Sequence, residues 1–179
     1  LNKKNSVLPK EVAELAITLG VDDQPPARPE RGPPKPKGPR QSDAIRKPYR
    51  RYYSNGIEIR VGKKAQDNDL LSLSPEHRDD SDTWMHAAGC PGSHVVIRSR
   101  AAAVVSDEVL QDAAALAARQ SKCDGSVIKV SVTKCRDIRK PPGAKPGLVQ
   151  LVGKVRTISV NMKEAESRLK RLEETVLVN

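Results

Sequence analysis

Residues 82–97 read DTWMHAAGCPGSHVVI, in which two strand-like segments flank a turn rich in glycine and proline. The composition predicts one strand over 83–88 and a second over 94–97, where β-branched residues follow one another. A strand, a tight turn and a returning strand would bring His86 and His94 close together. This region therefore predicts a hairpin that carries a dense cluster of polar side chains at its turn.

On both sides of this predicted hairpin, short β-rich segments alternate with helical patterns. Residues 107–122 predict the main helix, because Ser106 can cap it and apolar residues recur on one face. The expected β-rich segments are 57–61, 70–73, 127–133 and 148–160, the last of them a hairpin turning near Gly153 and Lys154. The predicted fold class is α+β: a mixed, largely antiparallel sheet with one main helix packed on it, plus terminal helices and an extended Pro-rich basic arm.

The amino-terminal third has a different composition from the rest. A short helix is expected over 8–19, and eight of the chain's 14 prolines lie between Pro25 and Pro48, which favours extended backbone. We divide the chain into a helical segment (1–24), a Pro-rich basic arm (25–51), a globular domain (52–160) and a charged terminal helix (161–179). The cations of the arm are Arg28, Arg31, Lys35, Lys37, Arg40, Arg46, Lys47, Arg50 and Arg51. Two interpretations of the arm stand: a solvated linker, or a segment that orders on phosphate contact.

The charge balance favours a polyanionic partner. The chain has 32 Lys and Arg against 22 Asp and Glu, a formal net charge of +10 and a pI near 9.7, the range typical of nucleic-acid binding. Its mean hydropathy is −0.57, and no apolar run approaches the roughly 20 residues of a membrane-spanning helix. A membrane role is therefore not expected.

Cysteine content and the first residue bear on the compartment. Cys90, Cys123 and Cys135 are odd in number and unrelated in context, so free thiols and a reducing intracellular compartment are expected. The chain starts at Leu1 rather than Met, which suggests processing or a fragment boundary. We expect the plastid stroma, with the cytoplasm as the alternative.

The polar cluster at the hairpin turn is open to four interpretations. Asp82, His86, Cys90 and His94 have ligand atoms for zinc but not the closed spacing of a structural site. Cys90 with a neighbouring histidine could form a nucleophile and base, without a recognisable third group. The histidines could instead be structural, above all His94, which begins an apolar strand. Finally, Pro91, Gly92 and Ser93 could let a phosphate or ribose oxygen approach the backbone.

A second cluster, residues 134–147, runs from a strand end into a basic loop of prolines and glycines. A solvated surface loop and a preordered contact for a nucleic-acid backbone are both consistent with it, and we favour the contact.

Together these motifs resemble the NFACT-R domain of ribosome-associated quality-control factors. The similar segments are 56–63 with Asn68 and Asp69; Asp82, Trp84 and His86 with 91–97; the helix around Ala114–Ala118; and Arg139–Val149 with 157–160. The acidic segment 74–81 and the basic arm depart from the family pattern. The resemblance implies a stand-alone, non-catalytic RNA-binding protein without a cofactor or metal. It also implies tRNA or rRNA as ligand, and the large ribosomal subunit or another ribonucleoprotein as partner.

On this basis the expected RNA-binding residues are Trp84, His86, Pro91, Gly92, Ser93, Arg98, Arg100, Arg136, Arg139, Lys140 and Lys145, with the arm cations adding non-specific affinity. The main alternative is a structural assembly subunit that docks on a large complex through its arm and terminal helices. A metal-dependent hydrolase built on Asp82, His86, Cys90 and His94 is the third. The sequence sets no oligomeric state.

Overall fold

The computed structural model describes residues 10–18, 46–99 and 104–176, and the chain divides into two units, 1–42 and 43–179. In the first unit, helix α1 spans Lys10–Thr18, within the segment expected to be helical. Val12 and Leu15 expose 48% and 61% of their surface. None of the helices in the described part of the chain is long and apolar enough to span a membrane.

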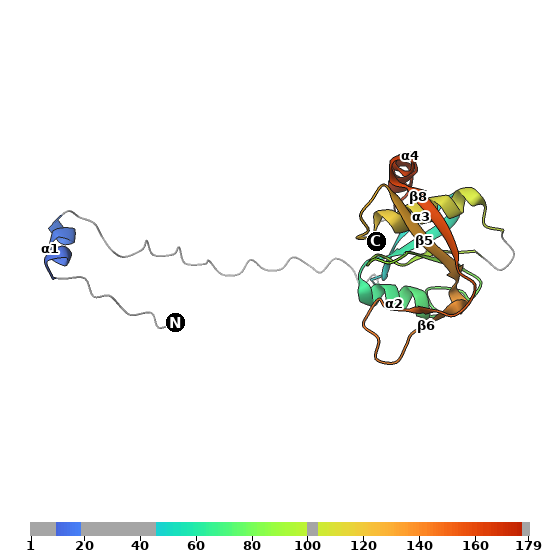
Figure 1. Cartoon of the computed structure of the whole chain (residues 1–179), viewed down its shortest axis with the longest axis horizontal. Coiled ribbons are helices and arrows are strands. Elements are labelled where there is room, and N and C mark those ends of the chain that lie inside the picture. The colour runs from blue at the N-terminus through green and yellow to red at the C-terminus, as the bar shows by residue number, and fades with distance from the viewer. Residues whose placement is uncertain (1–9, 19–45, 100–103, 177–179) are drawn as a thin grey trace. The chain divides into compact units, whose positions relative to one another are not determined.

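The second unit is built on a six-stranded sheet (Figure 1). Its strands are β1 (Tyr49–Ser54), β2 (Ile57–Gly62), β3 (Thr83–Ala87), β4 (Val95–Ile97), β5 (Val127–Lys134) and β8 (Arg156–Asn161), in the order β1-β2-β4-β3-β5-β8. Every pairing is antiparallel. Asn55 and Gly56, both with positive φ, make the tight turn between β1 and β2, as twisted two-residue hairpins require. The predicted hairpin of residues 82–97 is β3 and β4, with Thr83 opposite Ile97.

Helices cover both faces of the sheet. On one face, α3 (Asp107–Arg119) and α4 (Met162–Glu173) pack on the larger apolar core, to which β3 contributes Met85 and Ala87. On the other face lie α2 (Ala65–Leu73), a single 3₁₀ turn (Cys135–Asp137) and the ribbon of β6 (Ile138–Arg139) and β7 (Gln150–Leu151). Because side chains alternate along a strand, Trp84 and His86 face this second side. The predicted α+β class is confirmed.

One carboxylate ties the terminal helix to the domain. Asp112 of α3 is fully buried, yet it accepts hydrogen bonds from Ser54 Oγ (2.6 Å), Arg168 (3.0 Å) and Arg171 (2.7 Å). A buried charge is tolerated when it is paired and hydrogen-bonded. These three bonds join β1, α3 and α4 on one side of the sheet.

One expected strand and one expected hairpin are wrong. Residues 70–73 belong to helix α2, in which Leu71 packs under Trp84 while Asp67 and Asn68 turn polar side chains back toward the domain. Tertiary contacts of a short helix override the local preference for strand. Residues 148–160 are not a hairpin, because β7 pairs with β6 whereas β8 pairs with β5. At the crossing, Gly153 lies so close to Asp137 that a Cβ would overlap that carboxyl group.

The boundaries of the globular unit also differ from those expected. Strand β1 begins at Tyr49, inside the segment assigned to the arm, because Tyr49 and Tyr52 bury their rings in the two cores. At the other end, α4 packs against α3 and buries Ala165, Leu169 and Leu172. The second unit therefore includes residues on both sides of the span 52–160.

Candidate nucleic-acid interface

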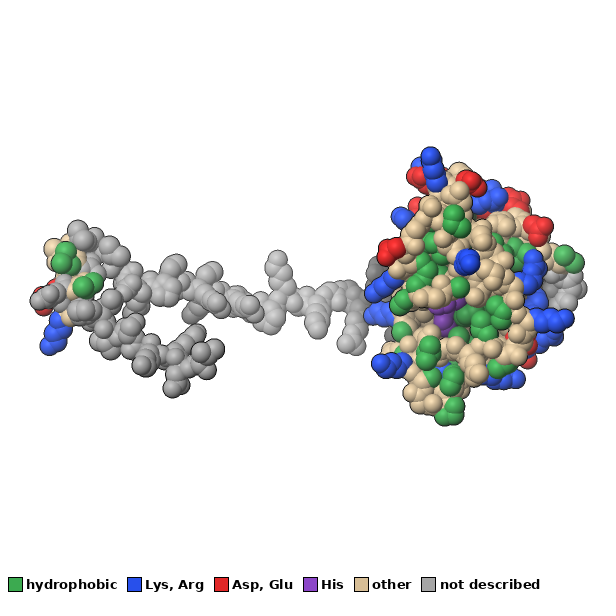
Figure 2. Space-filling model, viewed as in Figure 1, with side chains coloured by type: hydrophobic (Ala, Val, Ile, Leu, Met, Phe, Trp, Pro, Cys, Tyr) green, Lys and Arg blue, Asp and Glu red, His purple; other side chains and the backbone are tan. Residues whose placement is uncertain are grey.

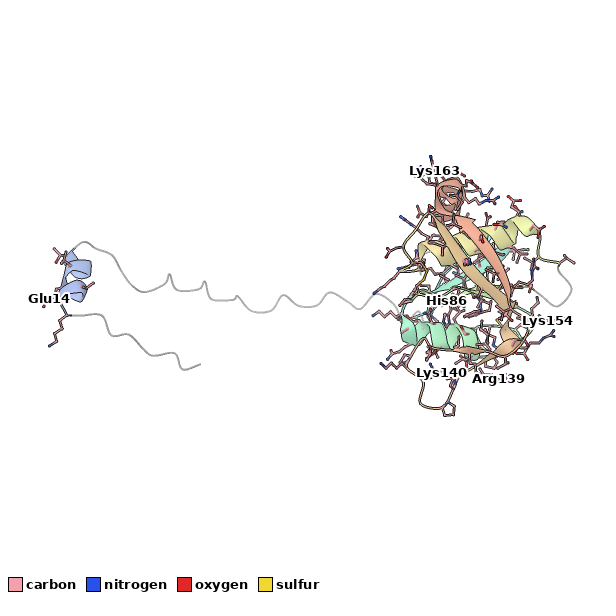
Figure 3. The ribbon with its side chains drawn as sticks, in the orientation of Figure 1. Glu14, His86, Arg139, Lys140, Lys154 and Lys163 are labelled. Carbon is pink, nitrogen blue, oxygen red and sulfur yellow. A yellow bond between two sulfur atoms is a disulfide. The ribbon has the colours of Figure 1, made fainter. Side chains whose placement is uncertain are left out.

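An open cavity of about 720 Å³ lies where α2, the β3–β4 turn and the end of α3 meet; we call it the His86 cavity. Histidine surface appears at the centre of this face, with Lys and Arg side chains around it (Figure 2). Figure 3 places His86 at the same point. Three lysines and no carboxylate are among the described residues that line the cavity. This lining is Lys63, Lys64, Ala65, Asn68, His86, Gly89, Cys90, Pro91, Gly92, Ser93, Gln120, Lys122, Pro146, Gly147 and Leu148.

His86 lies half-buried in this cavity. Its ring stacks on Trp84 at 5.9 Å between centroids and meets His94 edge-on at 5.3 Å. Burial lowers the pKa of His86 below its usual value, opposed by its contact with the Gly92 backbone. His86 is therefore neutral near pH 7 and can exchange hydrogen bonds with a ligand.

Trp84 and His94 support His86 from below. Trp84 is only 2% exposed, and its Nε1 donates to Ser72 Oγ (3.0 Å). Since that hydroxyl accepts from tryptophan, its own proton is free for His94 Nδ1 at 2.7 Å. Burial lowers the pKa of His94 to about 4, with neighbouring His86 adding to the shift. His94 is thus a structural histidine. Trp84, expected to contact the nucleotide, instead lies behind His86 with its indole N–H already occupied.

The turn itself is clamped by Asn68. Its Oδ1 accepts from the His94 amide (3.1 Å), and its Nδ2 donates to the Gly92 carbonyl (3.2 Å). Gly62 makes room for this clamp, because a Cβ there would overlap Asn68 Oδ1. Ser93 Oγ donates to the Gly62 carbonyl at 2.9 Å. The Ser93 hydroxyl therefore holds the turn in place, and its expected contact with an anion stays a prediction.

The β3–β4 turn is also hydrogen-bonded to the segment that follows α3. The Ser93 amide donates to Gln120 O (3.1 Å), and the Lys122 amide donates to Pro91 O (2.8 Å). Gly92 allows the approach, since a Cβ would lie 3.1 Å from Ser121 Cα. The exposed surface that Pro91 and Gly92 offer to a ligand is thus held rigidly.

The basic loop is anchored on α2 by one of its own cations. Lys140 Nζ donates to Asp69 (2.9 Å) and to the carbonyl oxygens of Lys145 (2.7 Å) and Leu148 (3.0 Å). An ammonium group has three donors, so Lys140 is committed to the loop. The expectation that it contacts phosphate is not supported by this placement. Arg136, Arg139 and Lys145 are exposed and carry the loop's available charge.

The other predicted cations are dispersed. Arg98 pairs with the buried carboxylate of Asp82 at 2.6 Å, and Arg46 pairs bidentately with Asp67. Lys47, Arg50 and Arg51 lie at or beside β1, on the opposite edge of the sheet from β8. The remaining predicted cations lie outside the described residues: Arg28, Arg31, Lys35, Lys37, Arg40 and Arg100.

The expectation of three free thiols is wrong. Cys90 and Cys123 form a disulfide, and only Cys135 is free. The sequence could not show this because the two cysteines are separated by 33 residues and meet only when the turn docks on the end of α3. Since two of the three cysteines are paired, the cysteine content no longer indicates a reducing compartment. The hydrolase alternative loses its thiol, and Asp82, one of the four residues on which it was built, is paired with Arg98. Among residues 10–18, 46–99 and 104–176, no group of three or more potential ligand side chains gathers.

Sequence reasoning missed the cations nearest His86. Lys63, Lys64 and Lys122 line the cavity, but they come from a strand exit and a helix end far apart in the chain. The pair Lys63-Lys64 after Gly62 was a signal within reach. Lys122 had no local signal, because only tertiary packing brings it to the cavity.

Comparison with known proteins decides the family. The model of the NFACT protein RNA binding domain matches residues 47–153. The chain belongs to this family. An Rqc2 homolog RqcH from Bacillus subtilis is 42% identical over 97 residues, which are 54% of this chain and 16% of that protein. An Rqc2 homolog RqcH from Streptococcus suis is 38% identical over 120 residues, 66% of this chain and 21% of that protein.

A solved structure agrees with the NFACT-R assignment. The C-terminal part of the fibronectin/fibrinogen-binding protein from Streptococcus suis superposes with a TM-score of 0.62 at 30% identity, covering 90% of this chain and 58% of that one. The NFACT-R chain spans about a fifth or less of the curated relatives it matches. The match places the RNA-binding family over β1 to β7 and hence over every element that forms the His86 cavity.

Proposed function

We propose that this protein binds single-stranded RNA segments of tRNA or rRNA at the His86 cavity and acts by binding rather than by catalysis. The observation that supports this most directly is the cavity's lining, in which three lysines surround a neutral imidazole without a carboxylate. Phosphates are attracted by the lysines, whereas an unstacked base or ribose meets His86 and the apolar walls of Pro91, Pro146 and Leu148. Single-stranded RNA is commonly recognised by such splayed nucleotides.

The exposed cations of the basic loop extend this surface. Arg139 lies at the edge of the face that carries His86 (Figure 3), and Lys145 lies in the loop that reaches the cavity through Pro146–Leu148. A backbone that leaves the cavity would meet these side chains, which set register without reading sequence. We include Arg136, Arg139 and Lys145 in the proposed interface.

Two matched double variants test the site. Lys64→Ala/Lys122→Ala removes two charges from the cavity, and Lys163→Ala/Lys170→Ala removes two from α4. Fluorescence anisotropy with a single-stranded RNA should show the cavity variant about tenfold weaker at moderate salt, because each lost phosphate contact also removes counterion release. The α4 variant should bind nearly as the wild type does. Equal losses in both variants would contradict a localised site.

We further propose the large ribosomal subunit or a related ribonucleoprotein as the partner. The relatives named as Rqc2 homologs support this choice. Crosslinking in cells, followed by sequencing of bound RNA, should recover tRNA or large-subunit rRNA with the wild type and much less with Lys64→Ala/Lys122→Ala. Recovery of no RNA above background, together with protein association that survives nuclease, would favour the assembly-subunit alternative.

A further inference from the structure

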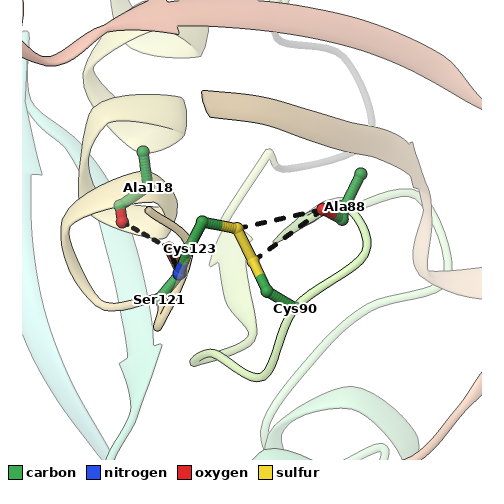
Figure 4. Close-up of a disulfide and its surroundings, with 5 residues drawn as sticks. All are labelled: Ala88, Cys90, Ala118, Ser121 and Cys123. Carbon is green, nitrogen blue, oxygen red and sulfur yellow. Dashed lines mark hydrogen bonds between the residues drawn. A yellow bond between two sulfur atoms is a disulfide. The ribbon is translucent and has the colours of Figure 1, made fainter. Parts of the chain in front are cut away.

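The disulfide lies in the wall of the His86 cavity. Cys90 belongs to the β3–β4 turn and lines the cavity, and Cys123 follows the last turn of α3, next to Lys122, which lines it too. Figure 4 shows the bridge between these two segments, with both sulfur atoms facing the Ala88 carbonyl. The bridge therefore connects the two walls that approach a bound ligand from either side.

The bridge is at the surface and only partly buried. Both cysteines are of intermediate exposure, and they pack at the margin of the main core rather than within it. Thiol–disulfide exchange requires access for the attacking thiolate. A disulfide placed here can be reached by a reductant in the folded protein.

The third cysteine cannot take part in the exchange. Cys135 is fully buried, and burial raises its pKa to about 12. The thiolate is the nucleophile in disulfide chemistry, so Cys135 remains inert at neutral pH. Cys90 and Cys123 are consequently either bridged or both reduced, and neither exchanges into a disulfide with Cys135.

The bridge is one of several contacts that hold the turn. The turn is also held by the Ser93–Gln120 and Lys122–Pro91 backbone bonds and by the Asn68 clamp, and the Ala88 amide donates to Lys129 O at 2.8 Å. Gly89 and Cys90 lie between Ala88 and Pro91. The disulfide links this part of the turn covalently to Cys123, in the segment that follows α3. Gly89 has a φ of +79°, and a Cβ added there would meet no atom within 4 Å, so the packing leaves room for the turn to move at this position.

We propose that the Cys90–Cys123 disulfide is a reversible thiol site, opened by a dithiol reductant, that sets the RNA affinity of the His86 cavity. The inference rests on the proposed function. In the exchange, a thiolate of the reductant attacks one sulfur and forms a mixed disulfide, which its second thiol resolves. The Cys90–Cys123 bond breaks, the reductant's disulfide forms, and two protons pass to the cysteines. Exchange with an oxidised protein dithiol reverses the step.

The oxidised state is the tighter binder. With the bridge closed, Gly89 and Cys90 are held in place beside Pro91 before RNA arrives, so binding loses less conformational freedom. With the bridge open, Gly89 and Cys90 gain alternative conformations that a ligand must select against. We expect reduction to weaken RNA binding by roughly five- to tenfold, the size of effect that ordering a few side chains produces.

The test compares the full chain in its oxidised and reduced forms. RNA affinity is measured by anisotropy before and after treatment with a protein dithiol reductant, with thiol trapping to report the redox state. Cys123→Ser should bind like the reduced wild type and ignore the reductant, whereas Cys135→Ala should respond as the wild type does. Amide hydrogen exchange over residues 88–93 and 120–123 should increase on reduction while exchange in β5 stays unchanged.

Each failure has its own signature. Equal RNA affinity of the oxidised and reduced wild type overturns the switch and leaves the proposed function intact. A bridge that resists the dithiol reductant, or a Cys123→Ser variant that unfolds, also overturns it, since the disulfide is then structural. An oxidised wild type that does not bind RNA contradicts the proposed function, and this inference falls with it.

Discussion

At the scale of single residues, the position of His86 depends on side chains that pack behind it and hold its turn. The ring of His86 stacks on Trp84, which is held by its hydrogen bond to Ser72. Asn68 holds the adjacent turn through its hydrogen bond to the Gly92 carbonyl. Buried polar networks are rigid when every member is satisfied. Substitutions in or beside this layer should therefore change the stability of the fold and the position of His86. Gly62→Ala and His94→Gln test this.

Gly62→Ala should displace the Asn68 clamp. The new methyl group overlaps Asn68 Oδ1, so the bonds to the His94 amide and the Gly92 carbonyl are lost and their partners remain buried. We expect a destabilisation of about 2–3 kcal/mol, measured by urea denaturation. Gly143→Ala is the control, because it has positive φ but open space and should cost only about 1–2 kcal/mol. Similar costs in both variants would rule out the steric explanation.

His94 should make stability fall in mild acid. Its pKa is about 4 when folded and about 6.5 when unfolded, so below pH 6.5 the unfolded chain takes up a proton that the folded one refuses. Stability is fully present above pH 6.5 and is lost as pH falls toward 4, by up to about 3 kcal/mol. Urea titrations at several pH values should show this slope in the wild type and a flatter slope in His94→Gln. Parallel slopes would contradict it.

At the scale of elements, the sheet presents two chemically different faces. The α3–α4 side is an aliphatic core rich in alanine, closed by the charges around Asp112. The other side is covered by short elements, α2 and the β6–β7 ribbon, joined by Lys140 and Asp69. The cavity lies on this second side, where short elements leave part of the sheet accessible.

The Asp112 cluster should stabilise α4 as a coupled unit. Arg168→Met/Arg171→Met leaves a fully buried carboxylate with only Ser54 as partner, which should cost about 3 kcal/mol. Adding Asp112→Asn should recover part of this loss, because the buried charge disappears. Thermal unfolding of the double and triple variants measures the coupling. A triple variant that is no more stable than the double variant would contradict this coupling.

Lys140 and Lys145 should differ in how they affect RNA binding. Lys145 is exposed, so Lys145→Ala should make the log–log salt slope shallower by about 0.7, one phosphate on a single strand. Lys140→Met frees the loop from Asp69 and should weaken binding while leaving that slope unchanged. Anisotropy across a salt series separates the two effects. A shallower slope for Lys140→Met would restore it as a phosphate contact.

The sequence predicted most strands and the main helix, because alternation in 57–61 and the cap at Ser106 are local signals. It mistook 70–73 for a strand, since three of these four residues are leucines. The helix they belong to is stabilised by Asn68 and Asp69 contacts across the domain. The hairpin and His86 were within reach of local patterns. The lysines around His86 and the disulfide arise from long-range packing and were not.

At the scale of the whole molecule, charge is divided between the folded surface and the arm. Four to six phosphate contacts predict a log–log salt slope of about −3 to −4 for single-stranded RNA. Replacing five of the nine arm cations with serine should make the slope shallower without changing the preference among RNA sequences. The five are Arg28, Arg31, Lys35, Lys37 and Arg40. Binding across a salt series with two competing RNAs measures both quantities. A changed preference would assign the arm a role in recognition.

The contacts of Asp112 also constrain the order in which the domain can fold during synthesis. Its partners lie 58 residues before it and 56 and 59 residues after it, so the earliest strand and the last helix close on one carboxylate midway between them. Closure by such distant contacts is slow compared with local helix formation. While the chain emerges from the ribosome, the alanine-rich face of α3 stays uncovered until α4 has cleared the exit tunnel. The side of α3 that packs on α4 is therefore among the last parts of the core to be covered during synthesis.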